Sequence, residues 1–129
     1  MRHDVLADAL SALKTVKDKG QTEVVIRPIS KLIVRVFEVL KKEGYLDSFE
    51  IVEDKRGGLA QVKLSNQINN VGVIKPHFSS TLAEFEKFER RYLPAKDFGR
   101  LIVSTSKGIM THLEAKAINQ GGALLAYVY

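Results

Sequence analysis

The sequence contains no cysteine, no long apolar run and no low-complexity stretch. Without cysteine, disulfide bonds, zinc–thiolate sites, iron–sulfur clusters and a cysteine nucleophile are excluded. No apolar run approaches the roughly 20 residues that a helix needs to cross a bilayer. The first residues mix charged and apolar side chains, unlike a signal peptide. We therefore expect a cytoplasmic protein with no membrane partner.

The composition is that of a folded globular protein with a basic surface. Of its 129 residues, 45% are hydrophobic and 27% are charged, and the net charge is +5. The length favours one domain, or two small halves that share a core. The positive charge favours an anionic partner such as nucleic acid. It is spread over residues 1–65 and 66–129 with no basic tail, so a nucleic acid would contact a folded surface.

Hydrophobic periodicity and turn residues predict an α-β-α-β-β order for the first half. Asp4 is a candidate cap for the first helix, and Ser30 for the second. The second helix has a wide apolar stripe from Leu32 to Leu40 and ends near Gly44. The remaining predicted elements are a helix over 4–19, strands over 23–26, 45–54 and 59–65, and a hairpin turn over 54–58.

The second half starts near residue 66 and mixes strands with short helices. Two capping boxes, Thr81 with Glu84 and Thr111 with Glu114, predict helix starts. The predicted strands cover 71–75, 100–104 and 122–129, and the helices end near Pro94 and Gly121. We therefore expect an α+β fold of two small α/β halves, residues 1–65 and residues 66–129.

A polar segment after an apolar strand is the best candidate for a functional site. It consists of Ser104, Thr105, Ser106, Lys107 and Gly108. Its hydroxyl groups suit ribose 2′-OH groups and base edges, its lysine suits a phosphate, and its glycine permits close approach. An ordinary hydroxyl-rich turn that closes a strand explains the same residues. The local pattern leaves both interpretations open.

The pattern does not favour an enzyme or a metal site. Ser104 and Lys107 have the S-x-x-K spacing of a serine–lysine hydrolase, but the accompanying S-D-N and K-T-G tripeptides are absent. His3, His77 and His112 lack metal-ligand spacing, and we expect His112 to be exposed in the first turn of its helix. We expect no catalysis, no metal and no cofactor.

Aromatic and charged side chains have simpler structural explanations. Phe37, Phe85 and Phe88 lie on helical stripes and are expected in the core, although aromatic rings can also stack on unpaired bases. Tyr127 and Tyr129 alternate along the last strand and are expected to share one face. The charged residues between 84 and 91 are expected to form a solvated helix face, with no site assigned on charge alone.

The run from Gly99 to His112, followed by Glu114-Ala115 and Gly121-Gly122, resembles the C-terminal signature of the eighth small-subunit ribosomal protein family. The ending from Leu125 to Tyr129 is similar to the archaeal branch of that family. Further similarities extend the resemblance across essentially the whole chain: Arg27-Pro28, Glu43-Gly44-Tyr45, Gly72 to Pro76, and Arg91 to Ala95.

The resemblance implies a structural, non-enzymatic constituent of the small ribosomal subunit. Members of this family are primary binders of the central domain of small-subunit ribosomal RNA and support assembly. They recognise an irregular hairpin, chiefly through its minor groove. The implied partners are this RNA and neighbouring ribosomal proteins. Some bacterial members also bind their own messenger RNA, which leaves a regulatory mRNA binder as an alternative.

The resemblance also implies which residues contact RNA. Ser104 to Gly108 would form the RNA-reading loop, with Thr105 and Ser106 on bases and riboses, Lys107 on phosphate and Gly108 at a close approach. Gly121 and Gly122 would shape the neighbouring turn. The first helix would add Asp4, Ser11, Lys14 and Thr15. The chain departs from the family pattern with Thr15 in place of Asn, Leu113 in place of a basic residue, and Asn119-Gln120 in place of a pair that contains glycine.

Overall fold

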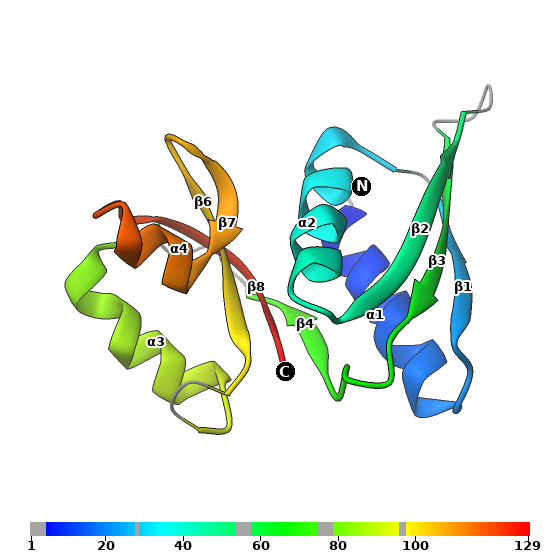
Figure 1. The fold of residues 1–129 in the computed structure, drawn as a ribbon, viewed down its shortest axis with the longest axis horizontal. Coiled ribbons are helices and arrows are strands. Elements are labelled where there is room, and N and C mark those ends of the chain that lie inside the picture. The colour runs from blue at the N-terminus through cyan, green and yellow to red at the C-terminus, as the bar shows by residue number, and fades with distance from the viewer. Residues whose placement is uncertain (1–4, 28, 54–57, 75–78, 96–97) are drawn as a thin grey trace. The chain divides into compact units, whose positions relative to one another are not determined.

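The computed structural model describes residues 5–27, 29–53, 58–74, 79–95 and 98–129. The predicted Asp4 cap, most of the predicted 54–58 turn, His3 and His77 lie outside these residues. The chain divides into two compact units, Met1–Gly72 and Val73–Tyr129, which are described separately (Figure 1).

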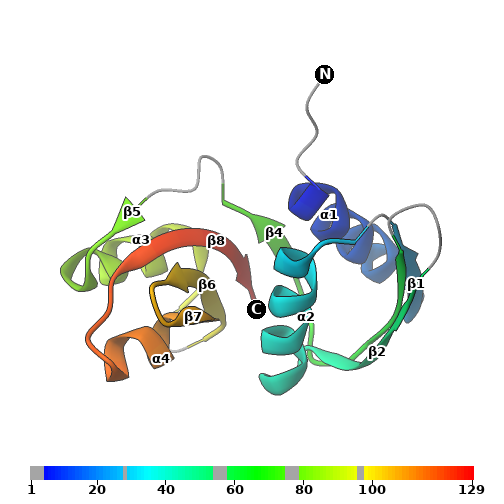
Figure 2. The same cartoon turned by 90° about the horizontal axis from the view of Figure 1, so that it is seen from above.

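The first unit packs two helices against an antiparallel sheet, as Figure 2 shows from above. Its strand order is β1-β3-β2. In β3, Ala60, Val62 and Leu64 are buried while Gln61 and Lys63 are exposed, so the opposite face of the sheet is open. The elements are α1 (Val5–Asp18), β1 (Glu23–Ile26), α2 (Lys31–Lys42), β2 (Leu46–Val52) and β3 (Leu59–Leu64).

Helix α2 illustrates how local sequence signals set the bounds of an element. The hydroxyl of Ser30 accepts a hydrogen bond from the Ile33 backbone N–H at 3.3 Å, which caps the start. The apolar stripe is buried, with Phe37 and Leu40 completely inaccessible to solvent. Gly44 has a φ of +86° and ends the helix, a conformation that glycine adopts at little cost. The order α-β-α-β-β predicted for this half is confirmed.

The second unit is built around a larger sheet with the strand order β4-β8-β6-β7, and β5 pairs with β8. The boundary between the two units falls within β4, after Gly72. Its core joins both helices to the two central strands through Ile74, Phe85, Leu101, Ala115 and Leu124. The elements are β4 (Val71–Val73), β5 (Ser79–Ser80), a 3₁₀ turn (Leu82–Glu84), α3 (Phe85–Tyr92), β6 (Arg100–Thr105), β7 (Gly108–Thr111), α4 (His112–Ala117) and β8 (Gly122–Val128).

The α+β class is confirmed, while β5 and β7 are additions that the sequence pattern did not reveal. Strand β7 covers only Gly108–Thr111 and begins with a glycine, so it has too few alternating residues to give a signal. Tertiary pairing with β6 defines it instead. No helix in the described part of the chain is long and apolar enough to cross a membrane.

Candidate nucleic-acid interface

The polar segment forms the tip of a β-hairpin. Strands β6 and β7 pair antiparallel, with Ser104 opposite Ile109 and Thr105 opposite Gly108. Ser106 and Lys107 therefore make the whole connection between the strands. The backbone is that of a turn that closes a strand. Contact with RNA at this turn stays a prediction.

The hydroxyl of Thr105 holds the hairpin tip together. It donates to the carbonyl oxygen of Gly108 at 2.9 Å and accepts from the backbone N–H of Lys107 at 3.0 Å. If the turn changes conformation, these two hydrogen bonds break, and the Gly108 carbonyl and the Lys107 N–H must find other partners. The Thr105 side chain therefore rigidifies the tip, and less of its hydrogen-bonding capacity remains for a ligand.

Replacing Thr105 with valine should loosen the tip, because valine has a similar shape and no hydroxyl. We expect the free energy of unfolding to fall by about 1 kcal/mol and the Lys107 amide hydrogen to exchange faster. Thr105→Ser keeps the hydroxyl and serves as the control. Chemical denaturation and amide hydrogen exchange measure both effects, and identical behaviour of the two variants would contradict this role.

The outer surface of the tip is exposed at Ser106, Lys107 and Gly108. Gly108 has a φ of +123°, and a Cβ built there would meet no atom within 4 Å. Open space at this position leaves room for a ligand to approach the backbone closely. The Ser106 hydroxyl donates to Oε1 of Gln120 at 3.0 Å, so a residue outside the hairpin joins the surface.

Gly121 and Gly122 lie where the chain enters β8, and each packs against backbone. A Cβ on Gly122 would overlap the carbonyl oxygen of Ser104, and one on Gly121 would lie 2.6 Å from the carbonyl oxygen of Ser80. Gly122 begins β8 and Gly121 immediately precedes it. Their absent side chains permit this close approach beside the hairpin.

The end of α4 explains why asparagine stands at position 119. Asn119 has a φ of +57°, the left-handed conformation that usually favours glycine and that asparagine tolerates. Its backbone N–H donates to the Lys116 carbonyl at 3.2 Å, and the N–H of Gln120 donates to the Ala115 carbonyl at 2.9 Å. This pair of bonds is a Schellman motif, so Asn119 performs the conformational role of the expected glycine.

His112 is buried, with 2% of its surface exposed, so its predicted exposure is wrong. Nδ1 accepts from the Leu101 backbone N–H at 3.1 Å, and Nε2 lies 3.0 Å from Oε1 of Glu89. The neutral ring therefore carries its proton on Nε2 and donates it to the carboxylate. Glu89 also contacts Lys116 Nζ at 2.6 Å. The sequence around His112 did not reveal these contacts, because Leu101 lies on β6 and Glu89 lies on α3.

Burial lowers the pKa of His112 below its ordinary value; Lys116 and Arg100 lower it further, while Glu89 opposes them. In the unfolded chain His112 takes up a proton near pH 6.5, whereas in the folded chain it does so only at lower pH. We therefore expect stability to be unaffected by this group above pH 6.5 and to fall below it, by at most about 1.4 kcal/mol per pH unit. Urea denaturation at pH 7.5 and 5.5 measures the loss, which His112→Gln should reduce. Equal losses would contradict this assignment.

The proposed residues on the first helix form a separate group in the first unit. Ser11, Lys14 and Thr15 are exposed on α1, while Leu10 and Leu13 are buried on its other side. The Lys14 ammonium lies 3.7 Å from a carboxylate one turn further on, and both groups are exposed. Such surface pairs contribute little to stability. Lys14 can therefore exchange this partner for another anion at little cost.

The aromatic predictions are confirmed by burial and ring geometry. Phe37, Phe85 and Phe88 are buried. The rings of Tyr127 and Tyr129 stack at 6.4 Å, so the two residues share one face. The ring of Tyr92 stacks on that of Tyr127, with the centroids 5.5 Å apart. These tyrosines pack against the core of the second unit.

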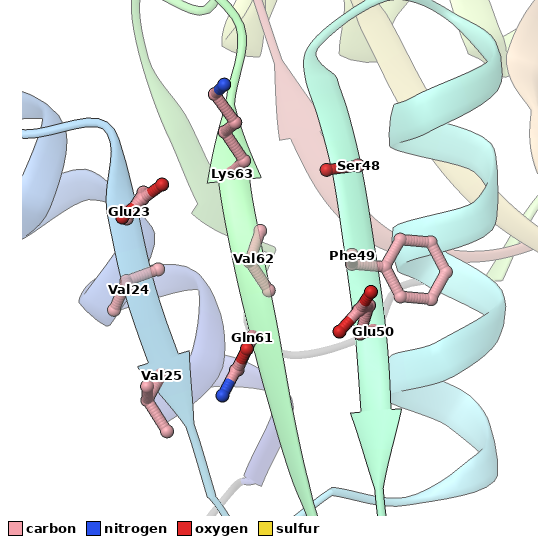
Figure 3. A pocket seen from close by; sticks show the side chains of 9 residues that line it. All are labelled: Glu23, Val24, Val25, Ser48, Phe49, Glu50, Gln61, Val62 and Lys63. Atoms are coloured by element: carbon pink, nitrogen blue, oxygen red, sulfur yellow. The ribbon is translucent and has the colours of Figure 1, made fainter.

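A shallow hollow lies over the open face of the first sheet (Figure 3). Strands β1, β2 and β3 all contribute to it, and Glu23, Glu50 and Lys63 give it both signs of charge. The residues that the structure describes contain no cluster of histidine and carboxylate side chains able to hold a metal ion. The exposed hairpin tip is the candidate that the sequence singles out, and its function stays a prediction.

The fold and the composition define a small basic α+β protein of two compact units. The family model of ribosomal protein S8 matches residues 4–129. Three archaeal proteins, each described as small ribosomal subunit protein uS8, align over 100% of this chain and 100% of their own length. They are 48% identical in Picrophilus torridus, 46% in Nanoarchaeum equitans and 50% in Archaeoglobus fulgidus.

The chain belongs to the ribosomal protein S8 family and is of the archaeal type. The family is structural and non-enzymatic, so the expectation that the chain is not an enzyme is confirmed. The serine–lysine hydrolase alternative is therefore set aside.

Proposed function

We propose that this protein binds the central domain of small-subunit ribosomal RNA in the cytoplasm and supports assembly of the subunit. The hairpin tip of the second unit contacts an irregular RNA hairpin through its minor groove. Residues 66–129 form the main RNA-binding half, and α1 adds a second contact through Ser11, Lys14 and Thr15. The observation that carries the proposal is the exposure of Ser106, Lys107 and Gly108 on a rigid tip.

The chemistry of the tip suits RNA better than DNA. An A-form helix hides its major groove and displays 2′-hydroxyl groups in a wide, shallow minor groove. The small tip offers the Ser106 hydroxyl for such groups and Lys107 for a phosphate. Ser104 and Thr105 support this surface, and Gly108 leaves room for a ribose. The net charge of +5 is modest, so shape and hydrogen bonds must supply specificity.

Replacing Ser106 with alanine should weaken RNA binding by on the order of 1–3 kcal/mol, because a polar group of the RNA loses its partner. Chemical footprinting on an archaeal small-subunit ribosomal RNA transcript should show one protected central-domain hairpin, with reduced protection by the variant. Ser48→Ala, an exposed serine on the first sheet, is the control. An unchanged footprint and affinity for Ser106→Ala would overturn the assignment of the tip.

Lys107 should contribute through a phosphate contact. We expect Lys107→Ala to reduce the slope of log affinity against log salt by about 1, since one fewer counterion is released. Filter binding between 50 and 300 mM salt measures the slope, with Lys63→Ala as the matched control. A slope equal to that of the wild type would remove Lys107 from the interface.

Neighbouring ribosomal proteins would be further partners of the RNA-bound protein. A messenger RNA that folds to the same irregular shape would meet the same tip, because the proposed contacts read ribose and shape. Competition between ribosomal and messenger hairpins tests this second RNA partner. Displacement of the ribosomal transcript by the messenger hairpin at similar concentration would support autoregulation, and no displacement would confine the site to the ribosome.

A further inference from the structure

The side chains of Ser106 and Gln120 join two turns of the second unit that lie 14 residues apart in sequence. The Ser106 hydroxyl donates to Oε1 of Gln120, with the oxygens 3.0 Å apart. One turn is the tip of the β6–β7 hairpin and the other connects α4 to β8. A hydroxyl on a surface turn rotates freely unless a partner selects one orientation. Gln120 supplies that partner.

The backbone of Gln120 is fixed before any ligand binds. Its N–H donates to the Ala115 carbonyl at 2.9 Å, within the Schellman motif that ends α4. Immediately afterwards, Gly121 packs against Ser80 and the chain enters β8. The position of the glutamine is therefore set on both sides by main-chain contacts. Its side chain starts from a rigid point next to the hairpin tip.

We propose that Gln120 is a positioning residue for RNA recognition: it holds the Ser106 hydroxyl so that this group acts as a hydrogen-bond acceptor. A serine hydroxyl has one proton and two lone pairs. Gln120 takes the proton, and the lone pairs remain for a donor on the ligand. In RNA, the donor present at every nucleotide is the ribose 2′-OH. The inference rests on the proposed function, because it assigns chemistry to the same tip.

The proposal predicts a specific pattern in a double-mutant cycle. Gln120→Met keeps an unbranched side chain of similar length and removes the amide. Ser106 then loses its orientation, and affinity for the RNA should fall by about 2–10-fold, the factor that corresponds to one net hydrogen bond. Ser106→Ala should cost at least as much. The double variant should match Ser106→Ala, because Gln120 acts through Ser106.

A second readout separates positioning from a general loosening of the fold. Each protein is titrated with an archaeal central-domain RNA transcript. A second titration uses the same RNA with 2′-deoxy substitutions at the nucleotides that the wild-type protein protects in footprinting. The wild type should prefer the unmodified RNA, and Gln120→Met should lose part of that preference. Gln120→Glu keeps an acceptor for Ser106 and should restore it. Comparing two RNAs of equal charge cancels the repulsion that the carboxylate adds.

The outcomes distinguish the two proposals. If Ser106→Ala leaves affinity unchanged, the proposed RNA site at the tip is wrong. If Ser106→Ala weakens binding while Gln120→Met has no effect, or if the losses simply add, the site stands and the positioning role is overturned. Gln61→Met, on the exposed face of the first sheet, controls for the substitution itself. A melting temperature of Gln120→Met equal to that of the wild type confirms that folding is unaffected.

Discussion

Replacing Gly122 with alanine is expected to lower the free energy of unfolding by about 3 kcal/mol, because the added Cβ would overlap the Ser104 carbonyl oxygen. This oxygen belongs to the backbone of β6, which pairs with both β7 and β8. Because the obstacle is a backbone atom and not a flexible side chain, β6 and β8 must separate locally to make room. Small domains are stable by only about 5–15 kcal/mol, which makes the loss large. Chemical denaturation measures it directly.

Gly20→Ala is the matched control for this effect. Gly20 has a φ of +75°, and a Cβ there would meet nothing within 4 Å. Its replacement therefore costs only the backbone strain of a left-handed residue, about 1–2 kcal/mol. Gly122 has no such φ, so its cost comes from overlap alone. Equal losses for the two variants would contradict the close packing of β8 on Ser104.

The elements with strong local signals could be predicted from the sequence. Ser30 before an apolar stripe, and Thr111 three residues before Glu114, place helix starts where the structure has them. Apolar periodicity sets both the type of element and the buried face, because a helix and a strand repeat at different spacings. The α+β class follows from those elements.

Elements and contacts that depend on a partner strand or helix could not be predicted in this way. Strand β7 exists because β6 lies beside it, and four residues carry no periodic signal of their own. His112 is buried because Glu89 and Leu101 satisfy its two ring nitrogens. Glu89 lies within a charged helix segment that was expected to be solvated. Only the tertiary contact distinguishes this carboxylate from its neighbours.

The candidate site shows the same division. The hydroxyl-rich run identifies residues 104–108, because its composition is unusual after an apolar strand. The sequence does not reveal that the Thr105 hydroxyl forms hydrogen bonds within the tip, whereas the Ser106 hydroxyl bonds to Gln120 on a neighbouring turn. Gln120 gave no signal beyond its departure from the family pattern. A partner 14 residues away becomes visible only when the end of α4 is placed beside the hairpin.

Replacing Phe85 with alanine should have the largest effect on the second unit, lowering its free energy of unfolding by about 3–5 kcal/mol. The ring is fully buried in a cluster that includes Leu101 and Val103 of β6, the strand that carries Ser104 and Thr105. Phe98→Ala is the control in the same unit, because 48% of Phe98 is exposed and its loss should cost far less. Similar losses for the two variants would contradict this account of the core.

The same variant separates folding from recognition. Phe85 is buried and is not one of the proposed contact residues, so we expect the folded molecules of the variant to keep their affinity for RNA. The apparent affinity then falls in proportion to the folded fraction. Raising that fraction with a stabilising osmolyte such as trimethylamine N-oxide should restore binding by Phe85→Ala but not by Ser106→Ala. Recovery of both variants, or of neither, would contradict this separation of the core from the hairpin tip.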